Sequence, residues 1–66
     1  MEAQIKESLI SLLDGISRSD EQVIAAEMAR LDGFVAVGRT TLPGQLIHFL
    51  ERRSYAKALV YLGGKP

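Results

Sequence analysis

Apolar residues near the start of the chain recur at helical spacing. They follow an i, i+4, i+7, i+8, i+11 pattern, which places them on one stripe of an α-helix. The stripe consists of Ile5, Leu9, Leu12, Leu13 and Ile16. Gly15 is placed to end this helix, because glycine is unfavourable in a helix interior. The pattern therefore predicts a helix over about 3–14 with its stripe in a core.

A second helix is predicted over about 20–32, and it has the clearest start signal in the sequence. Ser19 and Gln22 stand three positions apart and form a capping box, in which each side chain satisfies a backbone amide left unpaired. Asp20 lies in the first turn, where the helix dipole favours an anion. The apolar face consists of Val23, Ile24, Ala26, Met28, Ala29 and Leu31. Gly33 is the expected left-handed C-cap.

Residues 34–37, Phe-Val-Ala-Val, allow two interpretations. Their β-branched character suits a strand, but four residues without a strand partner cannot form a sheet. The stretch is either extended or a continuation of the preceding helix, with Phe34 and Val37 in the core. Residues 38–41 form the main loop, and Pro43 marks the first turn of a third helix, where its missing N–H costs little.

The C-terminal apolar residues form two sets that face different directions. At 100° per residue the centres of the two sets lie roughly 150° apart. The first set is Leu46, Ile47, Phe49 and Leu50, and the second is Tyr55, Ala58, Leu59 and Leu62. A break near Arg53 resolves the conflict and predicts helices over about 43–52 and 55–62, the latter capped by Ser54. The alternative is one long helix between two neighbours, as in a dimer.

These elements predict an all-α fold, a small bundle of three to four short helices around a single core. We expect one domain over residues 1–66, with Gly63 and Gly64 ending the last helix and residues 63–66 as a frayed tail. A chain of this length buries a small core and usually needs a disulfide, a metal or a partner subunit. The sequence has no cysteine and one histidine, so self-association is the stabilising device that remains.

The zero net charge of the chain hides an uneven distribution. Residues 1–33 contain seven acidic and three basic side chains, a net charge of −4, whereas residues 34–66 contain one acidic and five basic side chains, a net charge of +4. A polarised domain of this kind can bind an acidic partner with its basic half, or pair with a second copy of itself.

The basic half supplies the candidate partner-binding residues. They form a predicted rim with two aromatic or imidazole side chains among the cations: Arg39, His48, Arg52, Arg53, Tyr55 and Lys57. Cations beside flat rings also suit nucleic acid, which makes an accessory nucleic-acid binder using Arg52, Arg53 and Lys57 the alternative function. The sequence pI near 6.5 argues against that alternative, since dedicated nucleic-acid domains are usually basic.

Two apolar features are candidate docking elements. The Met28 and alanine face of the second helix could form an exposed groove, and Phe34 or Tyr55 could anchor a partner. Burial in the core is the competing interpretation for each of them.

No feature of the sequence indicates catalysis. His48 and Glu51 stand three positions apart and could form a histidine–carboxylate pair, but such a pair arises easily by chance. No cysteine nucleophile, second histidine or glycine-rich phosphate loop accompanies it. We therefore predict a protein that is not an enzyme, with no cofactor, no metal and no small-molecule substrate.

The start of the chain lacks the basic residues and apolar run of a signal peptide, and no window is long and apolar enough to span a membrane. We expect a cytoplasmic protein without a membrane partner. The predicted function is a small interaction module, most simply a homodimer, that binds a protein partner or itself through apolar helix faces beside the basic rim.

Overall fold

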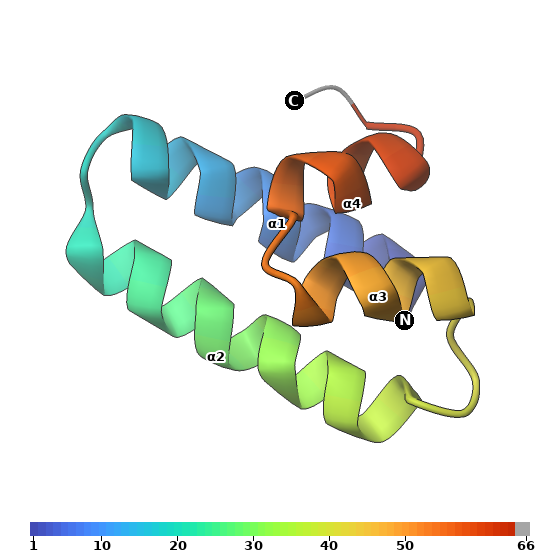
Figure 1. Cartoon of the computed structure of the whole chain (residues 1–66). Helices are drawn as coiled ribbons and strands as arrows, with labels where there is room; N and C mark the ends of the chain where they lie inside the picture. The colour runs from blue at the N-terminus through green and yellow to red at the C-terminus, as the bar shows by residue number, and fades with distance from the viewer. Residues whose placement is uncertain (65–66) are drawn as a thin grey trace.

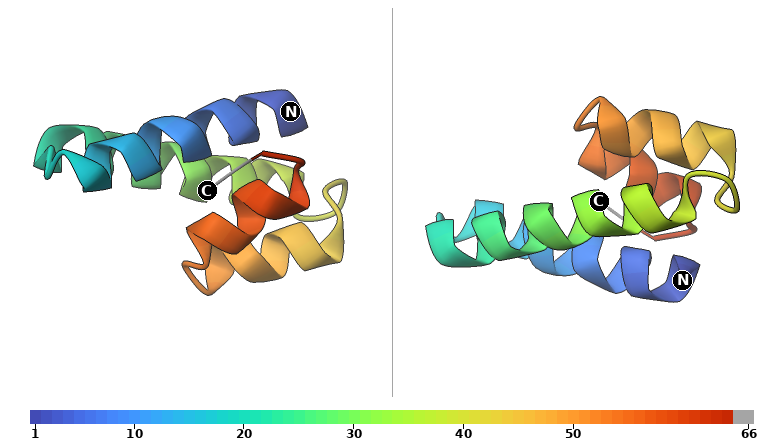
Figure 2. Two further views of the ribbon diagram at one scale, coloured as in Figure 1. Left: turned by 90° about the horizontal axis from the view of Figure 1, so that it is seen from above. Right: turned by 90° about the horizontal axis from the view of Figure 1, so that it is seen from below.

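Two long helices form one layer of the molecule and two short helices form the other (Figures 1 and 2). The computed structural model describes residues 1–64. In chain order the helices are α1 (Glu2–Ser17), α2 (Glu21–Gly38), α3 (Gly44–Glu51) and α4 (Tyr55–Tyr61). No strand occurs in these residues, so the predicted all-α class with four helices around one core is confirmed.

The core lies between the two layers. It is entirely aliphatic and draws on every helix and on the loop before α3: Ile5, Leu9, Leu12, Leu31, Val35, Leu42, Leu46, Ile47, Leu50, Ala58 and Leu59. α1 and α2 run antiparallel and supply one wall, and α3 and α4 supply the other. No helix within residues 1–64 combines the length and apolarity that a bilayer crossing requires.

The register of the α1–α2 hairpin is set by a close approach of the two backbones. A Cβ atom added at Gly15 would lie 2.8 Å from Cγ1 of Val23, so only glycine leaves room for this contact. Eight residues earlier in the sequence of contacts, the fully buried Ser8 hydroxyl donates a 2.7 Å hydrogen bond to Oε1 of Glu27. These two contacts fix how α1 and α2 lie against each other.

Helices α1 and α2 are both longer than the sequence predicted. α1 continues to Ser17, so the prediction that Gly15 ends it was wrong: the residue is a helix interior position selected for packing against Val23. α2 continues to Gly38, so the predicted C-cap at Gly33 was also wrong. Of the two interpretations of residues 34–37, helical continuation is correct, and it buries Val35 while Val37 is exposed rather than in the core.

The turn between α1 and α2 corrects the predicted capping box. Asp20, not Ser19, is the N-cap of α2, and its Oδ1 accepts from the Val23 amide at 3.2 Å. Ser19 has φ +56°, a left-handed conformation that belongs to the end of α1. The amides of Ser19 and Asp20 donate to the carbonyls of Ile16 and Gly15, the two bonds of a Schellman motif.

The break between α3 and α4 is confirmed. α3 ends in a second Schellman motif, in which Arg53 (φ +60°) donates to the Leu50 carbonyl and Ser54 donates to the Phe49 carbonyl. Ser54 is the N-cap of α4, although its side chain makes no capping hydrogen bond. Pro43 is the N-cap of α3 rather than part of its first turn.

A third Schellman motif ends α4, as the glycine pair predicted. Gly63 has φ +82° and donates to the Val60 carbonyl, and Gly64 donates to the Leu59 carbonyl. The remainder of the predicted frayed tail, Lys65 and Pro66, lies outside the described residues.

Glycines 15 and 33 offer a matched test of the hairpin. We expect Gly15→Ala to destabilise the protein by about 1–3 kcal/mol, because the new methyl group overlaps the stiff Val23 side chain. We expect Gly33→Ala to stabilise it by about 0.5–1 kcal/mol, because no atom lies within 4 Å of the added Cβ and alanine favours the helix. Urea unfolding measures both, and equal effects would contradict the packing role of Gly15.

The Ser8–Glu27 contact predicts a pH dependence of stability. The hydrogen bond from Ser8 is the largest of the effects that lower the pKa of Glu27 below its ordinary value of 4.5. Because the folded-state pKa is depressed, the stabilisation is present above about pH 4.5 and is lost as the pH falls through the folded-state value. Ser8→Ala should cost about 1–3 kcal/mol at neutral pH and make the acid-induced loss of stability shallower. Ser17→Ala, at an exposed position of the same helix, is the control and should change neither.

Candidate interaction surface

The two layers of the molecule differ in length. At 1.5 Å per residue, the 16 and 18 residues of α1 and α2 extend roughly 24 and 27 Å, whereas the 8 and 7 residues of α3 and α4 extend roughly 12 and 10 Å. α3 and α4 lie toward the end of the hairpin that carries the N-terminus (Figures 1 and 2). The end near the α1–α2 turn is therefore left without a second layer.

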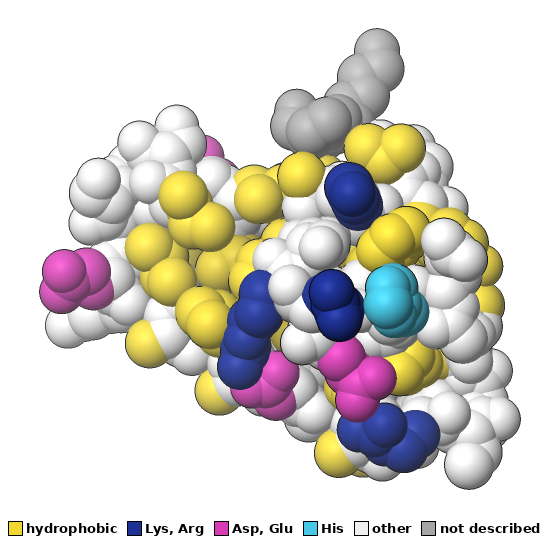
Figure 3. Space-filling model, in the orientation of Figure 1, with side chains coloured by type: hydrophobic (Ala, Val, Ile, Leu, Met, Phe, Trp, Pro, Cys, Tyr) yellow, Lys and Arg dark blue, Asp and Glu magenta, His cyan; other side chains and the backbone are white. Residues whose placement is uncertain are grey.

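The uncovered end of the hairpin is apolar. Ile16 lies on the same stripe of α1 as Leu9 and Leu12, which are fully buried, yet it is 47% exposed. The half-buried residues around it are Leu13 on α1 and Ile24 and Met28 on α2. We call these four residues (Leu13, Ile16, Ile24 and Met28) the hairpin platform. Figure 3 shows hydrophobic side chains gathered over this part of α1 and α2.

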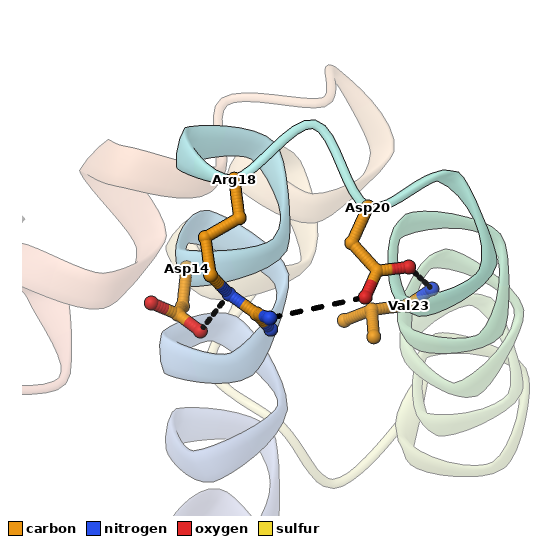
Figure 4. Close-up of polar contacts among 4 residues, drawn as sticks. All are labelled: Asp14, Arg18, Asp20 and Val23. Carbon is orange, nitrogen blue, oxygen red and sulfur yellow. Dashed lines mark hydrogen bonds and ion pairs between the residues drawn. The ribbon is translucent and has the colours of Figure 1, made fainter.

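Acidic side chains border the platform at the α1–α2 turn. Arg18 donates to Asp14 at 2.9 Å and lies 3.9 Å from Asp20, so one cation is shared by two carboxylates (Figure 4). Glu21 begins α2 beside them. The Arg18 and Asp14 side chains are more than half exposed, so the pairs contribute little to stability. The turn retains an excess of negative charge.

The predicted basic rim lies on α3, α4 and the adjoining turns, but acidic residues are interleaved with it. Arg39 donates to Oε2 of Glu51 at 2.9 Å. Arg53 lies 3.3 Å from Oδ1 of Asp32, across from α2. Figure 3 shows these charges mixed on one face, with Lys and Arg, the histidine and acidic side chains near one another. The strict separation of charge along the sequence is thus partly cancelled in three dimensions.

Arg53 is held in place by Tyr55 as well as by Asp32. The Arg53 guanidinium donates to the Tyr55 hydroxyl at 2.8 Å. This hydrogen bond, with the nearby Asp32 carboxylate, raises the pKa of Arg53 above its ordinary value. Tyr55 itself is half-buried and packs against the core, so it anchors α4 within the molecule.

Arg52, Lys57 and His48 are the rim residues with the greatest freedom to meet a partner. All three are exposed, and none of them takes part in an ion pair within residues 1–64. The carboxylate of Glu51 is bound to Arg39, so the His48–Glu51 pair considered from sequence is not formed in the described part of the chain. The His48 ring instead lies 6.1 Å from the Phe49 ring.

A second apolar surface lies on the outside of α3 and α4. It is an open groove of about 640 Å³ lined by Gln45, Phe49, Ala56, Lys57, Val60 and Tyr61, which we call the α3–α4 groove. The Phe49 and Tyr61 rings meet edge to face at 6.2 Å and form its floor. Val60 is 54% exposed, although valine usually avoids water.

Sequence reasoning found part of this surface. It identified Met28 as a candidate docking residue and grouped the rim, but it placed Ile16 in the core stripe and did not single out Val60 or Tyr61. The signal for Ile16 was available in the helix lengths, because short third and fourth helices cannot cover a longer hairpin. Phe34 packs against the core, with the Arg30 guanidinium 5.6 Å from its ring centre, so it is not an exposed anchor.

No group of three or more metal-ligating side chains comes together within residues 1–64. Comparison of the chain with protein-family models, with curated proteins and with solved structures found no match.

The left-handed backbone at Arg53 leads to a test of the α3–α4 turn. Glycine adopts φ +60° without the strain that arginine bears, and the exposed ion pair lost with Arg53 is worth at most about 1 kcal/mol. We expect Arg53→Gly to be more stable than Arg52→Gly by about 1 kcal/mol, since Arg52 has φ −86° and gains no such relief. Thermal unfolding compares them, and the reverse order would show that the Arg53 side chain holds the turn.

Proposed function

We propose that this protein is a small interaction module that forms homodimers through the hairpin platform. The observation that carries the proposal is the exposure of Ile16, a residue on the core stripe of α1 that has no second layer above it. Apolar side chains at such a position favour a partner that removes them from water. A chain of 66 residues also gains most from such a partner, because its own core is small.

Charge supports a second copy as the partner. The α1–α2 turn bordering the platform has an excess of carboxylates, whereas Arg52, Lys57 and His48 lie exposed on α3 and α4. In a twofold dimer whose axis runs across the hairpin, the acidic end of one copy meets the basic end of the other. This contact forms twice, and it favours association with the correct partner.

The alternative function, nucleic-acid binding by Arg52, Arg53 and Lys57, has weaker support. Arg53 is paired with Asp32, and Glu51 lies next to Arg52 in the sequence, so a phosphate backbone would meet carboxylates within the rim. Nucleic-acid interfaces depend on a surface of continuous positive potential. The proposed dimer, in contrast, needs only the two unpaired cations and the apolar platform.

Ile16 and Ile10 provide a matched test of the proposal. Both are exposed isoleucines of α1, at 47% and 50%, but only Ile16 belongs to the platform. We expect Ile16→Glu to raise the dimer dissociation constant at least tenfold, a loss of about 1.4 kcal/mol or more, and Ile10→Glu to leave it unchanged. Sedimentation equilibrium measures the constant, and circular dichroism checks that both variants remain helical.

A monomer at about 1 mM wild-type protein in low salt would contradict the proposal, since that concentration populates even weak dimers. Equal weakening by the two substitutions would show that the platform is not the interface. Weakening of the wild-type dimer by added salt is expected, because the charges at its margins are exposed and screened.

A further inference from the structure

The molecule presents two apolar surfaces to the same side. The hairpin platform and the α3–α4 groove both lie on the face shown in Figure 3, with the basic rim beside them. They differ in height, because the groove lies on top of α3 and α4 while the platform lies beside these helices, one layer lower (Figure 2). One helix layer is about 10 Å thick, so this face of the molecule has the shape of a step.

We infer that the platform of each copy is covered by the α3–α4 groove of the other copy. This inference rests on the proposed homodimer and names the surface that meets the platform. A twofold axis through the step places the raised half of one molecule over the lowered half of its partner. The same operation places the raised half of the partner over the first molecule, so the two contacts are identical and the assembly closes as a dimer.

The groove suits the platform in its chemistry. Val60 and the Phe49–Tyr61 ring pair offer an apolar surface to Ile16 and Met28. Lys57 lines the groove and is exposed, and the platform is bordered by Asp14, Asp20 and Glu21 with only Arg18 among them. Each contact therefore joins an apolar patch to an apolar patch and brings a cation to an acidic margin.

The competing arrangement places platform against platform. It would also cover Ile16, but it would leave Val60 and Tyr61 in water on both copies, at 54% and 44% exposure. The reciprocal arrangement covers both apolar surfaces with a single symmetry operation. Large exposed apolar patches are uncommon on proteins that have no use for them.

Engineered cysteines distinguish the two arrangements, because the chain has no cysteine of its own. The variants Ile16→Cys and Val60→Cys are each prepared alone and are then mixed under a mild oxidant. The reciprocal dimer predicts a disulfide-linked dimer in the mixture that contains one chain of each kind, and little cross-linking of Ile16→Cys alone. Efficient cross-linking of Ile16→Cys alone would overturn the inference and leave the proposed homodimer standing.

A complementation experiment tests the same contact without oxidation. Ile16→Glu removes the platform and Val60→Glu removes the groove, so each variant alone should dimerise at least tenfold more weakly than the wild type. A mixture of the two retains one intact platform–groove contact and should associate more tightly than either variant alone. Val37→Glu, at a 73% exposed position on α2, is the matched control and should dimerise as the wild type does.

The outcomes separate the inference from the proposed function. A normal dimer of Val60→Glu beside a weakened Ile16→Glu would refute the groove as the counter-surface while supporting the platform as the interface. Absence of any wild-type dimer would refute both. Circular dichroism of each variant excludes unfolding as the cause, and both substituted side chains are already about half exposed in the folded protein.

Discussion

The mismatch in length between the two helix layers is the constraint on which this structure depends. Two helices of 16 and 18 residues pack along each other, and helices of 8 and 7 residues cover only part of the face they share. Where the second layer is present, residues such as Leu9 and Leu12 are completely buried. Where it ends, the same stripe continues into Ile16 without cover. The platform is thus a direct consequence of the fold and not an addition to it.

The lengths of the helices are themselves decided at their C-termini. α1, α3 and α4 each end in a Schellman motif with a left-handed residue, but the residue is Ser19 in the first case, Arg53 in the second and Gly63 in the third. Only the glycine matches the residue that this motif prefers. The other two helix ends are held by the hydrogen bonds and packing of the turns that follow, so that α2 can return along α1 and α4 can fold back onto α3.

Charge has two different roles in the molecule. Along the sequence the acidic and basic residues are separated into halves, and folding brings part of each half together, as in the pair of Arg53 with Asp32. What survives is a weaker polarity, with carboxylates at the α1–α2 turn and Arg52, Lys57 and His48 exposed on α3 and α4. A partial polarity of this kind suits the orientation of a partner whose binding energy comes mainly from apolar contact.

The sequence by itself determined the helical class, the apolar stripe of α1, the break between α3 and α4 and the stop at Gly63, because each follows from local periodicity or backbone preference. It could not determine that α1 continues through Gly15 or that α2 continues through Gly33, since a glycine in a helix and a glycine that ends one look alike locally. The contact of Gly15 with Val23 distinguishes them, and it exists only between two packed helices. The exposure of Ile16 was likewise beyond local pattern. Whether an apolar residue on a helix stripe is core or surface depends on how far the opposite layer reaches, which only the tertiary structure decided.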